Sequence, residues 1–123
     1  MNPPAHDPPP GSRSIDDILA TARTRLRRLQ PTQAYAAQRS GALIVERNVL
    51  EWRFDPRCPA RLPIADRYDL PVIVLCQEGY TSSLAAAALH DLGLHQTTDI
   101  IGGFTAWTVA GLPRRHTTAP QTE

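Results

Sequence analysis

The hydrophobic pattern alternates between helical and strand periodicity along the chain. Apolar residues recur every three or four positions in three segments, whereas three short runs are rich in β-branched and apolar residues. The expected helices are residues 15–29, 31–39 and 82–92. The expected strands are residues 42–45, 72–75 and 98–101. Residues 48–54 fit either a short helical turn or a loop.

Residues at the segment ends support this division. Ser14 can cap the first helix, Pro31 can occupy the first turn of the second, and Gly93 can end the third. Strands that alternate with helices in this way are typical of an α/β domain with a parallel sheet. We therefore expect a small parallel β-sheet flanked by helices.

The length of 123 residues accommodates one small domain. Residues 1–13 contain five prolines and are expected to form a disordered tail. The expected domain, with its amino-terminal helix, spans residues 14–113, and residues 114–123 form a carboxyl-terminal tail.

Charge and hydropathy narrow the possible functions. The formal net charge is +1, so no strong field recruits nucleic acid. The proline-rich amino terminus does not resemble a signal peptide, and no apolar run approaches membrane-spanning length. We therefore expect a cytoplasmic protein that binds neither nucleic acid nor membrane. The one dense group of arginines, within residues 23–28, is interpreted as a solvated helix face, with a partner site as the alternative.

The two cysteines lie in different contexts. Cys58 stands among prolines and is interpreted as a bystander thiol, with a resolving partner for Cys76 as the alternative. Neither cysteine belongs to a CxxC or Cys/His spacing, so we expect no metal site and no cofactor.

Cys76 directly follows the strand predicted at residues 72–75 and precedes a short loop and a helix start. In open α/β sheets, ligands bind at the carboxyl ends of the strands. The first amides of a helix lack internal partners and favour an anion, and the thiolate is the nucleophilic form of cysteine. Cys76 is therefore the candidate catalytic nucleophile; a buried structural thiol is the alternative. The candidate substrate-binding residues follow it in the loop: Gln77, Glu78, Gly79, Tyr80, Thr81 and Ser82.

Two motifs of this chain resemble those of the rhodanese-like domains, a sulfurtransferase family. One is the loop that begins at Cys76 and contains Gly79. The other is the closing segment, residues 102–113, in which paired glycines, Phe104 and Trp107 precede Ala-Gly-Leu-Pro. The resemblance implies that Cys76 carries a persulfide from a small donor, thiosulfate or a persulfide, to a thiol or cyanide. It implies a monomer or homodimer that needs no cofactor.

The chain also departs from the family pattern. Active members often carry an arginine near the end of the cysteine loop, whereas this loop ends in Thr81-Ser82 and includes the acidic Glu78. Arg47 and Arg53 are candidates to supply a cation from elsewhere. Only one Gly-Ala-Leu-Ile-Val segment, residues 41–45, stands where the family has two strands, so we expect one strand and its connecting loop to be missing.

These departures keep two alternatives open beside sulfur transfer. One is a non-catalytic rhodanese-like module that binds or regulates, and the other is a redox-sensing thiol at Cys76. A cysteine phosphatase is disfavoured because such enzymes need Cys-x5-Arg to bind phosphate, and the residue six positions after Cys76 is Ser82.

Overall fold

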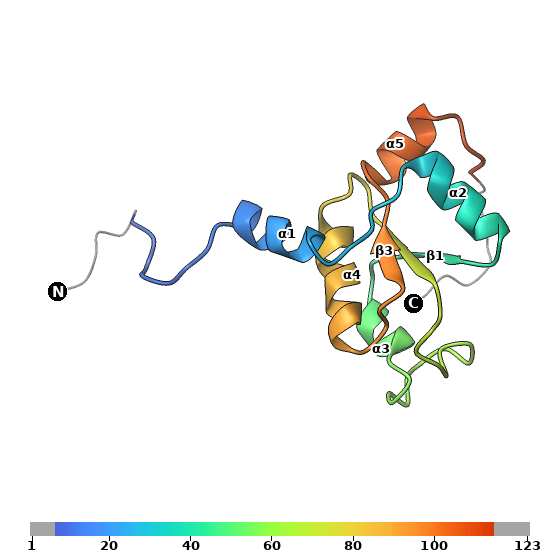
Figure 1. Ribbon diagram of the computed structural model, residues 1–123, viewed down its shortest axis with the longest axis horizontal. Coiled ribbons are helices and arrows are strands. Elements are labelled where there is room, and N and C mark those ends of the chain that lie inside the picture. Colours follow the sequence, from blue (N-terminus) through green and yellow to red (C-terminus); the bar gives the residue numbers. More distant parts are fainter. Residues whose placement is uncertain (1–6, 115–123) are drawn as a thin grey trace.

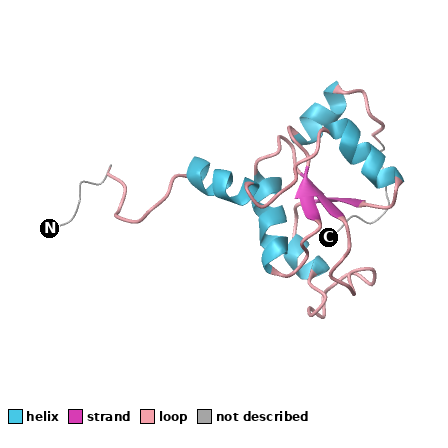
Figure 2. Ribbon diagram, viewed as in Figure 1, coloured by secondary structure: helices cyan, strands magenta, loops and turns pink. Residues whose placement is uncertain are grey.

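The computed structural model describes residues 7–114 as a parallel sheet with helices on both faces (Figures 1 and 2). Residues 1–6 and 115–123, which belong to the two expected tails, lie outside the described residues. The elements in chain order are α1 (Ile15–Arg23), α2 (Pro31–Arg39), β1 (Leu43–Glu46), α3 (Leu50–Phe54), β2 (Val72–Leu75), α4 (Thr81–Asp91), β3 (Thr97–Asp99) and α5 (Gly103–Val109). The predicted α/β class and parallel sheet are confirmed.

The sheet has the strand order β1-β2-β3, and both pairings are parallel. The central strand β2 is apolar throughout because both of its faces are covered. Val72 and Val74 point into the cluster beneath α3 and α4, whereas Ile73 points into the cluster beneath α2 and α5. This alternation is the two-residue period of a strand. Because side chains of β2 pack into a hydrophobic cluster on each face of the sheet, the carboxyl end of the strand is held firmly in place.

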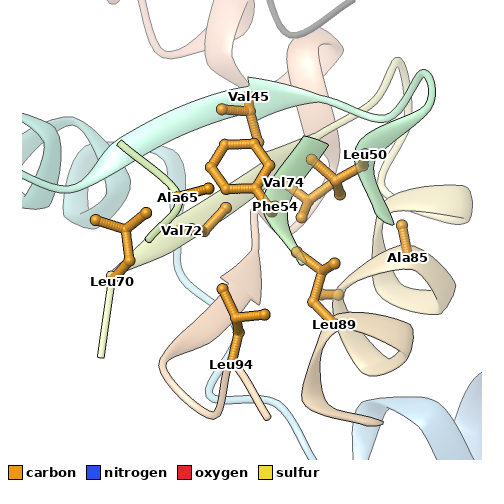
Figure 3. Packing of buried hydrophobic residues seen from close by; sticks show 11 residues of the cluster. Val45, Leu50, Phe54, Ala65, Leu70, Val72, Val74, Ala85, Leu89 and Leu94 are labelled. Atoms are coloured by element: carbon orange, nitrogen blue, oxygen red, sulfur yellow. The ribbon is translucent and has the colours of Figure 1, made fainter. Parts of the chain in front are cut away.

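The larger core lies between the sheet, α3 and α4. Phe54 is fully buried there, close to Val45 of β1 and Val74 of β2, and Leu89 reaches toward it from α4 (Figure 3). The ambiguous residues 48–54 thus contain a real helix, α3, which the burial of Leu50 and Phe54 fastens to the core. This packing fixes α4 against the sheet.

The predicted helix over residues 15–29 is wrong in its second half. Helix α1 ends at Arg23, and the chain then turns so that Leu29 forms a parallel bridge with Ile100. The Leu29 amide donates to the Asp99 carbonyl at 3.0 Å, and the Ile101 amide donates to the Leu29 carbonyl at 2.8 Å. These bonds to the sheet edge replace the helical bonds that the local pattern predicted. The other boundaries shift by smaller amounts, since β3 is residues 97–99 and α4 starts at Thr81.

A five-stranded sheet would contradict the expected loss of a strand. Within residues 7–114 the sheet has three strands, and β1 pairs directly with β2. The single segment at residues 43–46 therefore takes the place next to the strand that leads to Cys76.

Candidate active site

Cys76 follows the last residue of β2 and is half-buried. The loop after it folds back so that two backbone amides point at its sulfur. The Gly79 amide donates to Sγ at 3.2 Å, and the Ser82 amide does so at 3.3 Å. The loop and the first turn of α4 thus form an anion-binding concavity around the sulfur.

This environment changes the acidity of the thiol. Partial burial by itself raises the pKa of Cys76, but hydrogen bonds to the side chains of Ser82 and Thr81 and to the amides of Ser82 and Gly79 outweigh it and lower the pKa to about 7. At neutral pH about half of the molecules therefore carry a thiolate, whereas a free cysteine is only a few per cent ionised. The hydrogen bonds around the sulfur therefore favour the thiolate form of Cys76.

Two glycines allow the loop to close on the sulfur. Gly79 is buried with φ +89°, and a Cβ there would lie 2.9 Å from the Gly102 nitrogen. A Cβ on Gly103 would lie 2.3 Å from the Cys76 carbonyl oxygen. The Phe104 amide, in the first turn of α5, donates to that same carbonyl at 2.8 Å. The two motifs that were recognised separately in the sequence are thus one packed unit.

The six candidate substrate-binding residues divide into two groups. Gly79, Thr81 and Ser82 contact the sulfur through amides or hydroxyls. The other three have exposed side chains: Gln77, Glu78 and Tyr80. The first group therefore surrounds the sulfur, whereas the side chains of the second group are accessible to solvent.

A cavity of about 450 Å³ opens beside Cys76 and is lined by Glu46, Arg47, Asn48, Leu75, Gln77 and Phe104. Arg47 thus supplies a cation from outside the loop, as the sequence suggested. Its guanidinium also pairs with Glu51 at 2.8 Å. Arg53 does not line this cavity; it donates to the Ala60 carbonyl at 3.0 Å.

The interpretation of residues 23–28 as a solvated face is wrong for two of the four arginines. Arg23 and Arg28 are partly buried behind the cysteine loop, where both donate to the Gly79 carbonyl oxygen. Arg25 and Arg27 are exposed. Helix α1 ends before Arg28, and the turn that follows directs that side chain inward.

Asp99 is a second residue that the sequence did not reveal. It lies at the end of β3, is fully buried, and pairs with Arg28 at 2.8 Å. Ser82 and Ser83 donate to its carboxylate at 2.8 and 2.7 Å. An aspartate in a β-strand pattern was the only available signal, because its partners are distant in sequence.

Cys58 and Cys76 are both free thiols. Within residues 7–114, no three His, Cys, Asp or Glu side chains are grouped so as to hold a metal ion. No helix in the same range is long and apolar enough to cross a membrane.

The family model of the rhodanese-like domain matches residues 10–110 of this chain. The match covers the sheet, the cysteine loop and α5, so it includes the elements that surround the Cys76 sulfur. The chain belongs to the rhodanese-like domain family.

Individual relatives agree with this assignment. The thiosulfate sulfurtransferase GlpE of Stutzerimonas stutzeri is 31% identical over 101 aligned positions, and the alignment covers 68% of this chain and 86% of that protein. The GlpE of Actinobacillus succinogenes is 46% identical over 46 residues, which cover 37% of this chain and 41% of that protein. The chain thus spans less than half the length of several curated relatives that it matches.

One similar solved structure is a protein of unknown function from Rhodopseudomonas palustris, described as a possible tyrosine phosphatase. It is 30% identical, with a TM-score of 0.75, and the match covers 89% of this chain and 99% of that one. The likeness therefore extends over most of this chain.

The alignment with the Stutzerimonas protein contains gaps on the side of this chain. The 101 aligned positions are more than the 68% of this 123-residue chain that takes part in the alignment. The relative therefore has residues without a counterpart here.

Proposed function

We propose that this protein is a sulfurtransferase in which Cys76 carries sulfur as a persulfide. The observation that carries the proposal is the convergence of two amides and two hydroxyls on a half-buried sulfur whose pKa is about 7. The family membership and the sulfurtransferase relatives support it. The thiolate is the attacking form, and it is well populated at neutral pH.

The reaction consists of two displacements. The Cys76 thiolate attacks the outer sulfur of the donor, a new S–S bond forms, and the donor's own S–S bond breaks. The electron pair of that bond leaves with sulfite, if the donor is thiosulfate, or with a thiolate, if the donor is a persulfide. An acceptor thiolate or cyanide then attacks the outer sulfur on Cys76 and releases the cysteine as a thiolate. Two such half-reactions predict ping-pong kinetics.

The charges around the cavity bear on the donor. Arg47 can attract an anionic donor, but it already pairs with Glu51. Glu78 is exposed in the loop. A doubly charged donor therefore meets more repulsion than a singly charged one, so we expect a lower KM for a small persulfide than for thiosulfate.

A binding module without turnover is the second candidate. The observation in its favour is that no residue from Gln77 to Ser82 is a cation. Phosphatase activity lacks comparable support, although the Rhodopseudomonas protein is described as a possible tyrosine phosphatase. The nearest guanidiniums behind the loop, those of Arg23 and Arg28, are bound to the Gly79 carbonyl and do not form a bidentate phosphate site.

The test is an intact-mass measurement after incubation with thiosulfate or with glutathione persulfide. We expect a gain of one sulfur, about 32 Da, that a thiol or cyanide then removes. The Cys76→Ser variant should show no gain, and the Cys58→Ser variant should behave like the parent protein. If a folded parent protein gains no sulfur from either donor, the binding module becomes the better assignment.

A further inference from the structure

Residues 23–28, which precede the sheet in the chain, contact the Cys76 loop on the side opposite the sulfur. Arg23 Nη2 donates to the Gly79 carbonyl oxygen at 2.8 Å, and Arg28 Nη2 donates to the same oxygen at 3.1 Å. The amide of Gly79 meanwhile points at the Cys76 sulfur. The residue that donates to the sulfur on one side is therefore anchored by two guanidiniums on the other.

Asp99 joins this anchor to the start of α4. Arg28 contacts both carboxylate oxygens, through Nε at 2.8 Å and Nη2 at 3.3 Å. Ser82 and Ser83 donate to one of these oxygens, and Arg23 Nε donates to Ser83 Oγ at 3.0 Å. The amide and the hydroxyl of Ser82, both of which interact with the sulfur, thus have their position set by a buried carboxylate.

The charge balance of this group is unequal. Arg28 is neutralised by Asp99, whereas no carboxylate within residues 7–114 pairs with Arg23. Arg23 also lies 5.8 Å from the centroid of the Tyr80 ring. One uncompensated positive charge therefore stands directly behind a loop that has no cation of its own.

We propose that Arg23 and Arg28 are positioning residues that complete the sulfur-binding loop from the amino-terminal segment. Arg28 and Asp99 hold the loop in the shape that aims two amides at the sulfur. Arg23 adds the positive charge that favours the thiolate. The reactivity of Cys76 thus depends on residues more than 40 positions before it in the chain. This inference rests on the proposed role of Cys76 as the nucleophile.

The test uses Arg23→Gln in a Cys58→Ser background, so that Cys76 is the only thiol. The pH dependence of alkylation by iodoacetamide reports the pKa of that thiol without any sulfur donor. Removal of one nearby charge should raise the pKa by about half to one unit. Alkylation at about pH 6.5 should then slow by about threefold to eightfold, while the rates at high pH should stay close to those of the parent protein.

Matched variants separate positioning from general stability. Arg27→Gln removes an exposed arginine from the same segment and should leave the pKa unchanged. Arg23→Lys retains the charge and should restore most of the parent profile. Arg28→Gln leaves Asp99 buried without its cation and is expected to unfold at a lower temperature. Arg28→Gln with Asp99→Asn removes both charges, so this pair can be assayed for thiol pKa if the single variant does not fold.

The outcomes are distinct from those of the sulfur-loading experiment. A folded Arg23→Gln protein with the parent pKa would overturn the inference, even if its melting temperature fell. A raised pKa in a protein that never gains sulfur would support the inference and refute the proposed transfer reaction. Equal effects of Arg23→Gln and Arg27→Gln would also overturn it, because they would show a general response to net charge.

Discussion

The hydroxyl of Ser82 lies between the Asp99 carboxylate and the Cys76 sulfur, both of which can accept its proton. Removing this hydroxyl tests how much it lowers the pKa of the Cys76 thiol. Ser82 is fully buried; it donates to Asp99 at 2.8 Å and also hydrogen-bonds the Cys76 thiolate. One hydroxyl proton cannot serve both at once. Asp99 keeps Ser83 and Arg28 as donors, so it can release Ser82 when the sulfur loses its proton.

The size of the effect follows from the hydrogen bond that is lost. A hydrogen bond to a charged group contributes roughly 1.5 kcal/mol, and one pKa unit corresponds to about 1.4 kcal/mol. Ser82→Ala should therefore raise the pKa of Cys76 from about 7 to roughly 8. The thiolate fraction at neutral pH falls from about one half to about one tenth, so alkylation should slow about fivefold.

The assay is the pH profile of iodoacetamide alkylation, with thiolate absorbance near 240 nm as a second readout. The two proteins should react at similar rates at about pH 10, where both are ionised. Ser40→Ala removes an exposed serine at the end of α2 and should change nothing. An unchanged pKa in folded Ser82→Ala would refute the reasoning, because it would show that the proton stays on Asp99 and that the amides act alone.

Three further predictions concern stability. The pKa of Cys76 is lower in the folded protein, about 7, than the roughly 8.5 of an unfolded thiol. The free energy of unfolding from urea titrations should therefore rise with pH across that window relative to Cys76→Ser, by about 1 kcal/mol or less because the thiol is partly exposed. A difference that fell with pH would contradict the sign. Gly103→Ala should destabilise far more than Gly111→Ala in thermal melts, because only the former adds a Cβ that clashes, although both residues have positive φ; equal losses would disprove the clash. Phe54→Ala should lower the free energy of unfolding in urea by about 3–5 kcal/mol, because Phe54 is fully buried. Trp52→Ala should lower it by less than about 1 kcal/mol, because Trp52 is 59% exposed. Similar losses in the two variants would mean that Phe54 does not pack in the core.

Local sequence patterns predicted the elements that carry the chemistry. Residues 72–75 form β2 as predicted, because a run of β-branched residues suits a strand buried on both faces. Gly79 and the paired glycines at 102 and 103 have the positive φ values that glycine adopts without strain. Cys76 and the amides that point at its sulfur belong to this strand, loop and helix start, so the position of the candidate site could be predicted from the sequence.

The second half of the first predicted helix shows where local reasoning stops. Apolar spacing continued to Leu29, but that residue bridges Ile100 at the edge of the sheet. Helical propensity is a small energy per residue, and hydrogen bonds to a preformed edge together with burial outweigh it. No residue pattern near Leu29 indicates that it pairs with Ile100 instead of continuing the helix.

The sequence by itself therefore determined the class of the fold, the cysteine and the loop that surrounds it. Only the tertiary structure decided that Arg47 lines the cavity, that Arg23 and Arg28 lie behind the loop, and that Asp99 joins them to α4. The physical reason is separation along the chain. Strand, turn and cap preferences act between neighbouring residues, whereas the bond from Arg28 to Asp99 joins positions 71 residues apart and exists only once the sheet edge and the turn after α1 have formed.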